Sequence, residues 1–196
     1  EHVLAGGRND ASVYTRFMSP QPFSIVFAGT SDFAVPSLKA LATDPAFNVS
    51  LVITQPDRPV GRRGIVTPPA VKVAALELGL PLFQPERLNK EWQAHETELK
   101  ACDFLVVASY GQILSQEVLD LPKQMPVNVH ASLLPTWRGA SPLQHAILAG
   151  DTVSGVTIQK MIKELDAGPI LAQEKTDLEA RETWQTLHDR LAVIGA

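Results

Sequence analysis

The sequence predicts an α/β fold in which a mostly parallel sheet is covered by helices on both faces. From residue 24 onward, short apolar runs alternate with segments of helical spacing, as expected for strand–helix–strand units. The strand candidates are almost continuously apolar, as in DFLVVAS at 103–109, which is typical of strands buried on both faces. Two late strand candidates have no helix between them, so one is expected to run antiparallel or to lie at an edge.

The first half of the chain is predicted to form strands at 24–28, 48–54 and 80–84, and helices at 35–42, 70–79 and 89–100. Gly29 closes the first strand, and Ser31 or Asp32 is expected to cap the helix that follows. Gly79 is a C-terminal signal for the second helix. Residues 55–69, QPDRPVGRRGIVTPP, are rich in proline and arginine and are expected to form a loop.

The second half is predicted to form strands at 103–109, 126–130, 154–161 and 169–176, and helices at 115–122, 140–150 and from about 182 onward. Ser115 and Thr183 are candidate N-caps, and Gly150 marks the end of a helix. Residues 1–20 show no clear period. They are expected to be an extension, a tag or a weak targeting segment outside a folded domain at 21–196.

Composition narrows the function classes. The 196 residues are 45% hydrophobic, which is enough for one domain with a core, and no apolar run is long enough to span a membrane. The net charge of −4 argues against a general nucleic-acid coat but leaves room for a local basic patch. A single cysteine, Cys102, cannot form an internal disulfide, which fits a reducing compartment. We expect Cys102 to be a small buried hydrophobe rather than a catalytic thiol.

Several common sites are not supported by motif spacing. FAGTSDF lacks the GxGxxG spacing of a dinucleotide site, and no GxxxxGK[ST] phosphate loop occurs. The five histidines are scattered without partners at zinc-like spacing, so no metal is predicted. Ser132 lies in HASLL rather than in GxSxG, so a hydrolase elbow is unsupported.

Two polar side chains stand where the apolar run at 126–130 ends. Asn128 and His130 are two residues apart, and such residues point to the same side of an extended strand. An amide donor and an imidazole that exchanges protons near neutral pH suit a developing oxyanion. The alternative is that the pair only pins the loop that follows.

A third polar residue, Asp166, stands in LDAGPI, at the turn between the two late strands. If this turn faces His130, the carboxylate could orient the imidazole or take a proton through water. The alternative is a turn residue whose side chain bonds its own backbone.

The segments NVHASLLPTWRGASPLQ and GVTIQKMIKELDAGPIL resemble the core of the folate-dependent formyltransferases. The resemblance runs from about residue 24 to the end and includes FAGTSDFAVPSL, VVASYGQIL and AGDTVSGVTI. It implies a Rossmann-like formyltransferase fold and 10-formyltetrahydrofolate as co-substrate. The segments TQPDRPVGR and WRGASP are most similar to the enzymes that formylate initiator methionyl-tRNA.

The resemblance also implies roles for particular residues. Asn128, His130 and Asp166 would be the catalytic residues. Folate would contact a set drawn from three segments: Gln112, Ile113, Leu114, Met161, Leu165, and the wall residues Ser132, Leu133, Leu134 and Pro135.

Four arginines would contact tRNA: Arg58, Arg62 and Arg63 in the 55–69 loop, and Arg138 as a second candidate for RNA or for anchoring its loop. Guanidinium groups suit phosphates and unpaired bases. The alternative for the 55–69 arginines is an ordinary solvated loop.

The chain departs from the family pattern at Ala131, where glycine is frequent, and at Pro169, where the tRNA enzymes usually carry an acidic residue. The family's C-terminal barrel domain, which helps to grip tRNA, is absent from these residues. Alternatives are formyl transfer to glycinamide ribonucleotide or a sugar nucleotide, a hydrolase that releases formate, and a non-catalytic folate- or RNA-binding module. A monomer in a bacterial cytoplasm is expected, or an organelle form if residues 1–17 are native.

Overall fold

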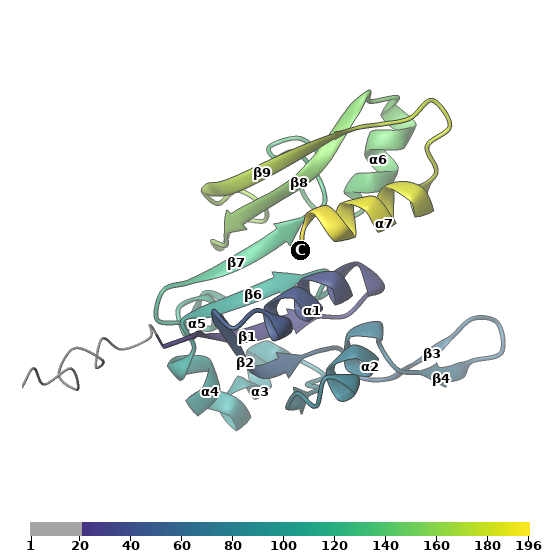
Figure 1. Ribbon diagram of the computed structural model, residues 1–196. Coiled ribbons are helices and arrows are strands. Elements are labelled where there is room, and N and C mark those ends of the chain that lie inside the picture. The colour runs from purple at the N-terminus through teal and green to yellow at the C-terminus, as the bar shows by residue number, and fades with distance from the viewer. Residues whose placement is uncertain (1–20) are drawn as a thin grey trace, which may run out of the picture.

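The computed structural model describes residues 21–196, and within them it contains a seven-stranded sheet and a separate two-stranded hairpin (Figure 1). The order across the sheet is β5 (Leu82–Phe83), β2 (Phe47–Ile53), β1 (Phe23–Gly29), β6 (Phe104–Ala108), β7 (Met125–His130), β8 (Val153–Lys160) and β9 (Ile170–Asp177). The strands from β5 to β7 are parallel. Strand β8 runs antiparallel to β7, and β9 runs antiparallel to β8 at the edge. The predicted sheet is confirmed, including its late antiparallel and edge strands.

Helices cover both faces of the sheet, because alternate side chains of the central strands point to opposite faces. In β1, Ile25 and Phe27 pack on one face and Val26 and Ala28 on the other, and all four are at most 1% exposed. The first face is covered by α1 (Val35–Thr43), α2 (Ala70–Glu77), α6 (Pro142–Ala149) and α7 (Trp184–Ile194). The second is covered by α3 (Leu88–Glu91), α4 (Glu96–Ala101) and α5 (Gln116–Leu119).

The order of the strands reverses between β1 and β6, because the chain first builds outward through β2 and then returns to the other side of β1. In such sheets, ligands bind beyond the carboxyl ends of the strands near the reversal. The carboxyl ends of β1, β6 and β7 lie at one edge of the sheet (Figure 1). This edge is where Asn128 and His130 leave β7.

Several predicted helix boundaries are confirmed. The Ser115 side chain accepts a hydrogen bond from the Val118 backbone at the start of α5, and Thr183 forms a capping box with Thr186 at the start of α7. Gly79 and Gly150 follow α2 and α6 with φ of 68° and 69°, a left-handed conformation that glycine adopts without steric cost.

Three local predictions are wrong. Neither Ser31 nor Asp32 caps α1, since a short 3-10 turn, η2 (Asp32–Ala34), precedes the helix and Ser31 Oγ donates to Ser109 Oγ instead. The helix expected at 89–100 is broken into α3, a 3-10 turn (η3, Trp92–His95) and α4, and each piece buries one large apolar residue against the sheet.

The third error is the loop expected at 55–69, which is a hairpin of β3 (Arg58–Val60) and β4 (Ile65–Thr67). Gly61 and Gly64, with φ of 69° and 59°, form its turn, since they adopt conformations that few other residues reach. Figure 1 shows the hairpin extending beyond α2, away from the main sheet.

Cys102 is fully buried, as expected, and its thiol donates to the Leu99 carbonyl. Among the described residues, no helix combines the length and apolarity needed to cross a membrane. The predicted extension at 1–20 lies outside the described residues.

Candidate active site

Asn128 and His130 lie on the same face of β7, as their spacing predicts. The antiparallel register places Asn128 opposite Gln159 of β8, and His130 opposite Thr157. Directly opposed residues in an antiparallel pair share one face of the sheet. The end of β7 and the facing part of β8 therefore present two amides, an imidazole and a hydroxyl together.

Asp166 is brought to this group by the connection between β8 and β9. Its Oδ1 accepts hydrogen bonds from Gln159 Nε2 at 2.8 Å and Asn128 Nδ2 at 3.3 Å. Its Oδ2 lies 3.6 Å from His130 Nδ1. The side chains of His130 and Asp166 are both 8% exposed, so water screens their interaction little. The amide, the imidazole and the carboxylate predicted from sequence therefore converge in one place.

The turn that carries Asp166 is sterically tight. Asp166 has φ of 47°, a conformation that few non-glycine residues adopt. Two residues later, a Cβ atom on Gly168 would lie only 1.8 Å from the Lys160 carbonyl oxygen. The glycine in LDAG is therefore required by close approach of two backbone segments, and that approach sets the position of Asp166.

The loop after β7 holds both His130 and Asp166 through its backbone. The Trp137 carbonyl lies 3.0 Å from His130 Nε2, and Gly139 N–H donates to Asp166 Oδ2 at 2.8 Å. A carbonyl only accepts, so Nε2 carries the hydrogen, and Nδ1 can donate toward Asp166 only in the imidazolium form. The Trp137 side chain is itself held, since its indole N–H donates to Asp151 Oδ2 and its ring stacks on His145.

Residues 132–135 form the segment behind His130. The Thr157 hydroxyl donates to the Ser132 carbonyl at 2.6 Å and accepts from Leu134 N–H at 3.0 Å. Ser132 Oγ donates to the Thr136 carbonyl, and Gln173 donates to the Leu134 carbonyl. These bonds fix the segment against β8 and β9, so it supports the loop that contacts His130.

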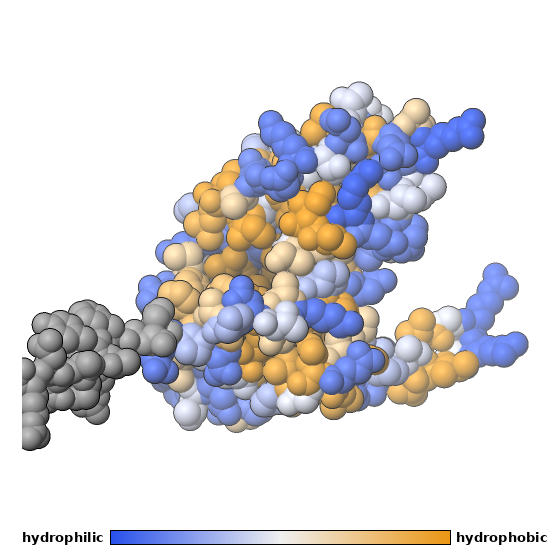
Figure 2. All heavy atoms as spheres, in the orientation of Figure 1, coloured by the Kyte–Doolittle hydropathy of each residue, from blue (hydrophilic) through white to orange (hydrophobic). Residues whose placement is uncertain are grey.

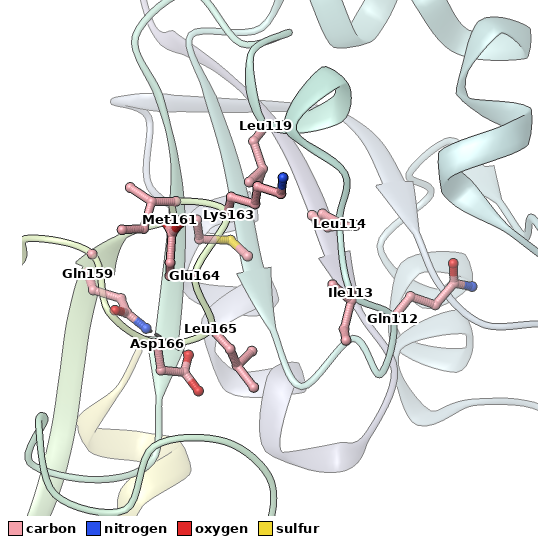
Figure 3. A pocket seen from close by; sticks show the side chains of 12 residues that line it. Gln112, Ile113, Leu114, Leu119, Gln159, Met161, Lys163, Glu164, Leu165 and Asp166 are labelled. Atoms are coloured by element: carbon pink, nitrogen blue, oxygen red, sulfur yellow. Dashed lines mark hydrogen bonds between the residues drawn. The ribbon is translucent and has the colours of Figure 1, made fainter.

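A pocket opens beside Asp166, between the segment after β6 and the segment after β8. Figure 3 shows Ile113 and Leu114 on one side of it and Met161 and Leu165 on the other, with the Gln112 side chain turned away from Met161 and Leu165. All five were predicted to contact folate, and all five line the pocket together with Gln159 and Asp166. Ser132, Leu133, Leu134 and Pro135 are not among its lining residues, and Leu133 instead lines a second pocket with Trp137 and Asp151.

The first wall of this pocket is anchored to α3. Gln112 accepts from Leu88 N–H and donates to the Glu86 carbonyl, while Asn89 donates to the Ile113 carbonyl and accepts from Ser115 N–H. These bonds hold Ile113 at the rim of the pocket, where the residue is 76% exposed.

The hairpin carries the predicted arginines. Arg62 and Arg63 are exposed in its turn, and Arg58 is ion-paired with Glu86 at its base. Exposed Val60, Ile65 and Val66 form an apolar stem below a hydrophilic tip, as Figure 2 shows. Arg138 is exposed in the loop beside the candidate site, between the Trp137 carbonyl and the Gly139 N–H.

The base of the hairpin is tied to the body through Asp57. Gln84 donates to Asp57 at 2.9 Å, and Lys72 Nζ lies 2.8 Å from both carboxylate oxygens. These two partners, the Gln84 hydrogen bond first, lower the pKa of Asp57.

In comparison with known protein families, residues 23–195 match the formyl transferase family. The chain belongs to the formyl transferase family. It is 56% identical over 172 residues to methionyl-tRNA formyltransferase of Halorhodospira halophila, covering 88% of this chain and 55% of that protein. It is 48% identical to methionyl-tRNA formyltransferase of Listeria innocua, covering 88% of this chain and 54% of that protein. This formyl transferase chain therefore spans about half the length of the curated relatives it matches.

Solved structures show the same fold in other formyl transferases. Phosphoribosylglycinamide formyltransferase from Bacillus halodurans aligns with a TM-score of 0.67 and 27% identity, covering 88% of each chain. Glycinamide ribonucleotide transformylase 1 from Symbiobacterium toebii aligns with a TM-score of 0.73 and 19% identity, covering 91% of this chain and 84% of that chain. The predicted Rossmann-like formyltransferase fold is confirmed.

Within residues 21–196, no cluster of three or more His, Cys, Asp or Glu side chains could hold a metal ion. The sequence reasoning missed Gln159 and the backbone groups of Trp137 and Gly139. Gln159 gave only a weak sequence signal, because the strand that contains it, VSGVTIQK, also carries Ser154, Thr157 and Lys160. The backbone groups had none.

Proposed function

We propose that this chain transfers the formyl group of 10-formyltetrahydrofolate to the α-amine of methionine esterified to initiator tRNA. The observation that carries the proposal is the convergence of Asn128, His130 and Asp166 beside a pocket near the carboxyl edge of the sheet. The identity of 56% to a protein named methionyl-tRNA formyltransferase supports this acceptor.

The three side chains have complementary roles in the proposed reaction. The amine attacks the formyl carbon, and the carbonyl oxygen becomes an oxyanion that Asn128 N–H and the His130 imidazolium stabilise. Asp166 orients His130 and helps to carry the proton from the attacking amine to the folate nitrogen, which leaves as the C–N bond breaks. The distance of 3.6 Å between His130 Nδ1 and Asp166 Oδ2 is slightly longer than a hydrogen bond, so a small movement of either side chain would bring them into direct contact.

The folate would occupy the pocket beside Asp166. Backbone groups at 112–114 can read the edge of a flat pterin ring, while Ile113 and Leu114 cover its face. An exposed Ile113 would be buried by such a ligand, which explains its position at the rim.

The acceptor end of the tRNA would contact the hairpin and Arg138. The hairpin follows the carboxyl end of β2, so it extends from the edge of the sheet that carries the site. Arg62 and Arg63 lie on its exposed turn in a chain whose net charge is −4, so they provide a local rather than a general site for RNA.

The test is formyl transfer from labelled 10-formyltetrahydrofolate to separate acceptors. Label on methionyl-tRNA supports the proposal. Glycinamide ribonucleotide is the second candidate acceptor, which Pro169 and the Bacillus halodurans structure favour. Label on glycinamide ribonucleotide or on an amino sugar nucleotide instead of methionyl-tRNA would assign formyl transfer to that acceptor. Label released as formate without an acceptor would assign a hydrolase. Folate binding without any transfer would indicate a binding module.

The role of Asn128 is tested by Asn128→Ala. Loss of one oxyanion donor should lower kcat about 100-fold, or ~3 kcal/mol, while the folate dissociation constant changes little. Asn48→Ala is a matched control, because Asn48 is exposed on β2. Equal losses of kcat and folate affinity would contradict the oxyanion role.

A further inference from the structure

Asn128 and Gln159 form a pair of amides on adjacent strands, and both point at one carboxylate oxygen. They are directly opposed in the β7–β8 register, and both donate to Asp166 Oδ1. The two bonds differ, because the Gln159 bond is 2.8 Å and the Asn128 bond is 3.3 Å. The longer bond lies beyond the usual range for N–H···O, so Gln159 is the principal partner of this oxygen.

The other oxygen of Asp166 has separate partners. Oδ2 accepts from Gly139 N–H at 2.8 Å and faces His130 Nδ1. The carboxylate is thus oriented, with Oδ1 toward the two amides and Oδ2 toward the imidazole. A carboxylate this buried needs its acceptor sites filled, since an unpaired buried charge is costly.

We propose that Gln159 is a positioning residue that fills Asp166 Oδ1 and so leaves the Asn128 amide free to donate to the oxyanion of the reaction. The inference rests on the proposed function, in which Asn128 N–H must leave Asp166 when the formyl oxygen gains charge. With Gln159 in place, Oδ1 keeps its shorter hydrogen bond when Asn128 turns away. Without Gln159, the only side-chain amide that reaches Oδ1 in the described structure is Asn128 itself.

The burial of Gln159 supports a specific role for the hydrogen bond from its amide to Asp166 Oδ1. The residue is 1% exposed, and its Oε1 has no hydrogen-bond partner among the described residues. An unpaired buried oxygen destabilises the fold, and an apolar side chain of similar length would avoid that cost. The favourable contact of its side chain is the one that its Nε2 makes with Asp166.

The first test is Gln159→Met, which keeps the length of the side chain and removes the donor. We expect kcat to fall at least about tenfold, because a hydrogen bond to a charged group is lost and Asn128 is retained at Asp166. The folate KM should change less than kcat, since Gln159 lines the pocket with only 1% of its surface exposed and binding does not require Asn128 to move. Gln185→Met is the matched control, because Gln185 Nε2 donates to Asp189 Oδ1 at 2.8 Å on the exposed side of α7.

A double-mutant cycle separates this role from a general structural one. If Gln159 acts by freeing Asn128, then adding Gln159→Met to Asn128→Ala should lower kcat by less than about twofold. The full tenfold loss in that background would overturn the proposal. Gln159→Glu, which replaces the donor by an acceptor, should lose more activity at neutral than at mildly acid pH, because only a protonated Glu can donate to Asp166.

A third measurement needs no activity. The side-chain NH₂ of Asn128, observed by NMR in the 196-residue chain, should exchange with solvent more slowly in Gln159→Met, because its bond to Asp166 tightens. Unchanged Asn128 exchange in a folded Gln159→Met protein would overturn the proposal, as would unchanged kcat. Absence of transfer by the unsubstituted chain to every acceptor would instead defeat the proposed function, and the exchange measurement would still report on the amide pair.

Discussion

Replacing Gly168 by alanine tests whether the tight turn sets the position of Asp166. The added Cβ would lie 1.8 Å from the Lys160 carbonyl oxygen, whereas ordinary contact begins near 3.4 Å. The turn must therefore move by about 1.6 Å, since neither group is the end of a flexible side chain. A misplacement of about 1 Å in a reacting constellation can cost about 100-fold in rate. We expect Gly168→Ala to lower kcat by about that factor although no reacting group is removed.

The assay is kcat for formyl transfer, measured with the thermal midpoint of the same protein. Overpacking should cost about 1–3 kcal/mol of unfolding free energy, which lowers the midpoint by several degrees. Gly150→Ala is the control, because its Cβ would meet nothing within 4 Å but its φ of 69° is unfavourable for alanine. It should be destabilised without losing kcat. If folded Gly168→Ala retained kcat within about threefold, our account of the turn would be wrong.

Three further predictions concern the β3–β4 hairpin, the loop that contains Trp137, and the buried thiol of Cys102. The double variant Arg62→Ala and Arg63→Ala should raise the KM for tRNA and reduce its salt dependence, while folate binding stays the same. The control double variant Lys39→Ala and Arg181→Ala should leave the KM for tRNA unchanged. Unchanged tRNA kinetics of the Arg62 and Arg63 variant at moderate salt would refute the prediction. Trp137→Phe keeps an aromatic ring next to His145 but removes the indole N–H that donates to Asp151. Because the Trp137 carbonyl contacts His130, kcat should fall severalfold. If the losses of Trp137→Phe and Asp151→Ala were additive in the double variant, the hydrogen bond between the two residues would not be their cause. Burial raises the pKa of Cys102 to about 11, so in the native protein alkylation at mildly alkaline pH should be far slower than for a free thiol and should accelerate as pH approaches that value. Labelling at the rate of a free thiol would contradict the buried environment.

Elements were predictable where the deciding interactions are local. Ser115 and Thr183 cap their helices through backbone groups three residues away, and Gly79 and Gly150 end helices by their own conformation. The same reasoning failed at Ser31, because its hydroxyl had a distant partner, Ser109, that the local pattern does not contain. A cap prediction therefore holds only when no competing partner lies across the fold.

The hairpin illustrates a different failure. Residues 55–69 contain the two glycines that a turn needs, but the prolines and arginines around them resemble a loop. Anchoring by the ion pair of Lys72 and Asp57 and the bond from Gln84 is tertiary, and it connects three segments far apart in the chain. Short strands with exposed side chains carry little periodic signal, because no buried face constrains their sequence.

The sequence by itself determined the order of strands and helices and the common side of Asn128 and His130, because both follow from repeat geometry along one segment. Only the tertiary structure decided that Asp166 meets them, that Gln159 stands opposite Asn128, and that one loop backbone holds the imidazole and the carboxylate. These contacts depend on the register between strands and on where a turn can fold without collision. Strand register and turn sterics depend on residues that are distant along the chain, so local sequence patterns do not predict these contacts.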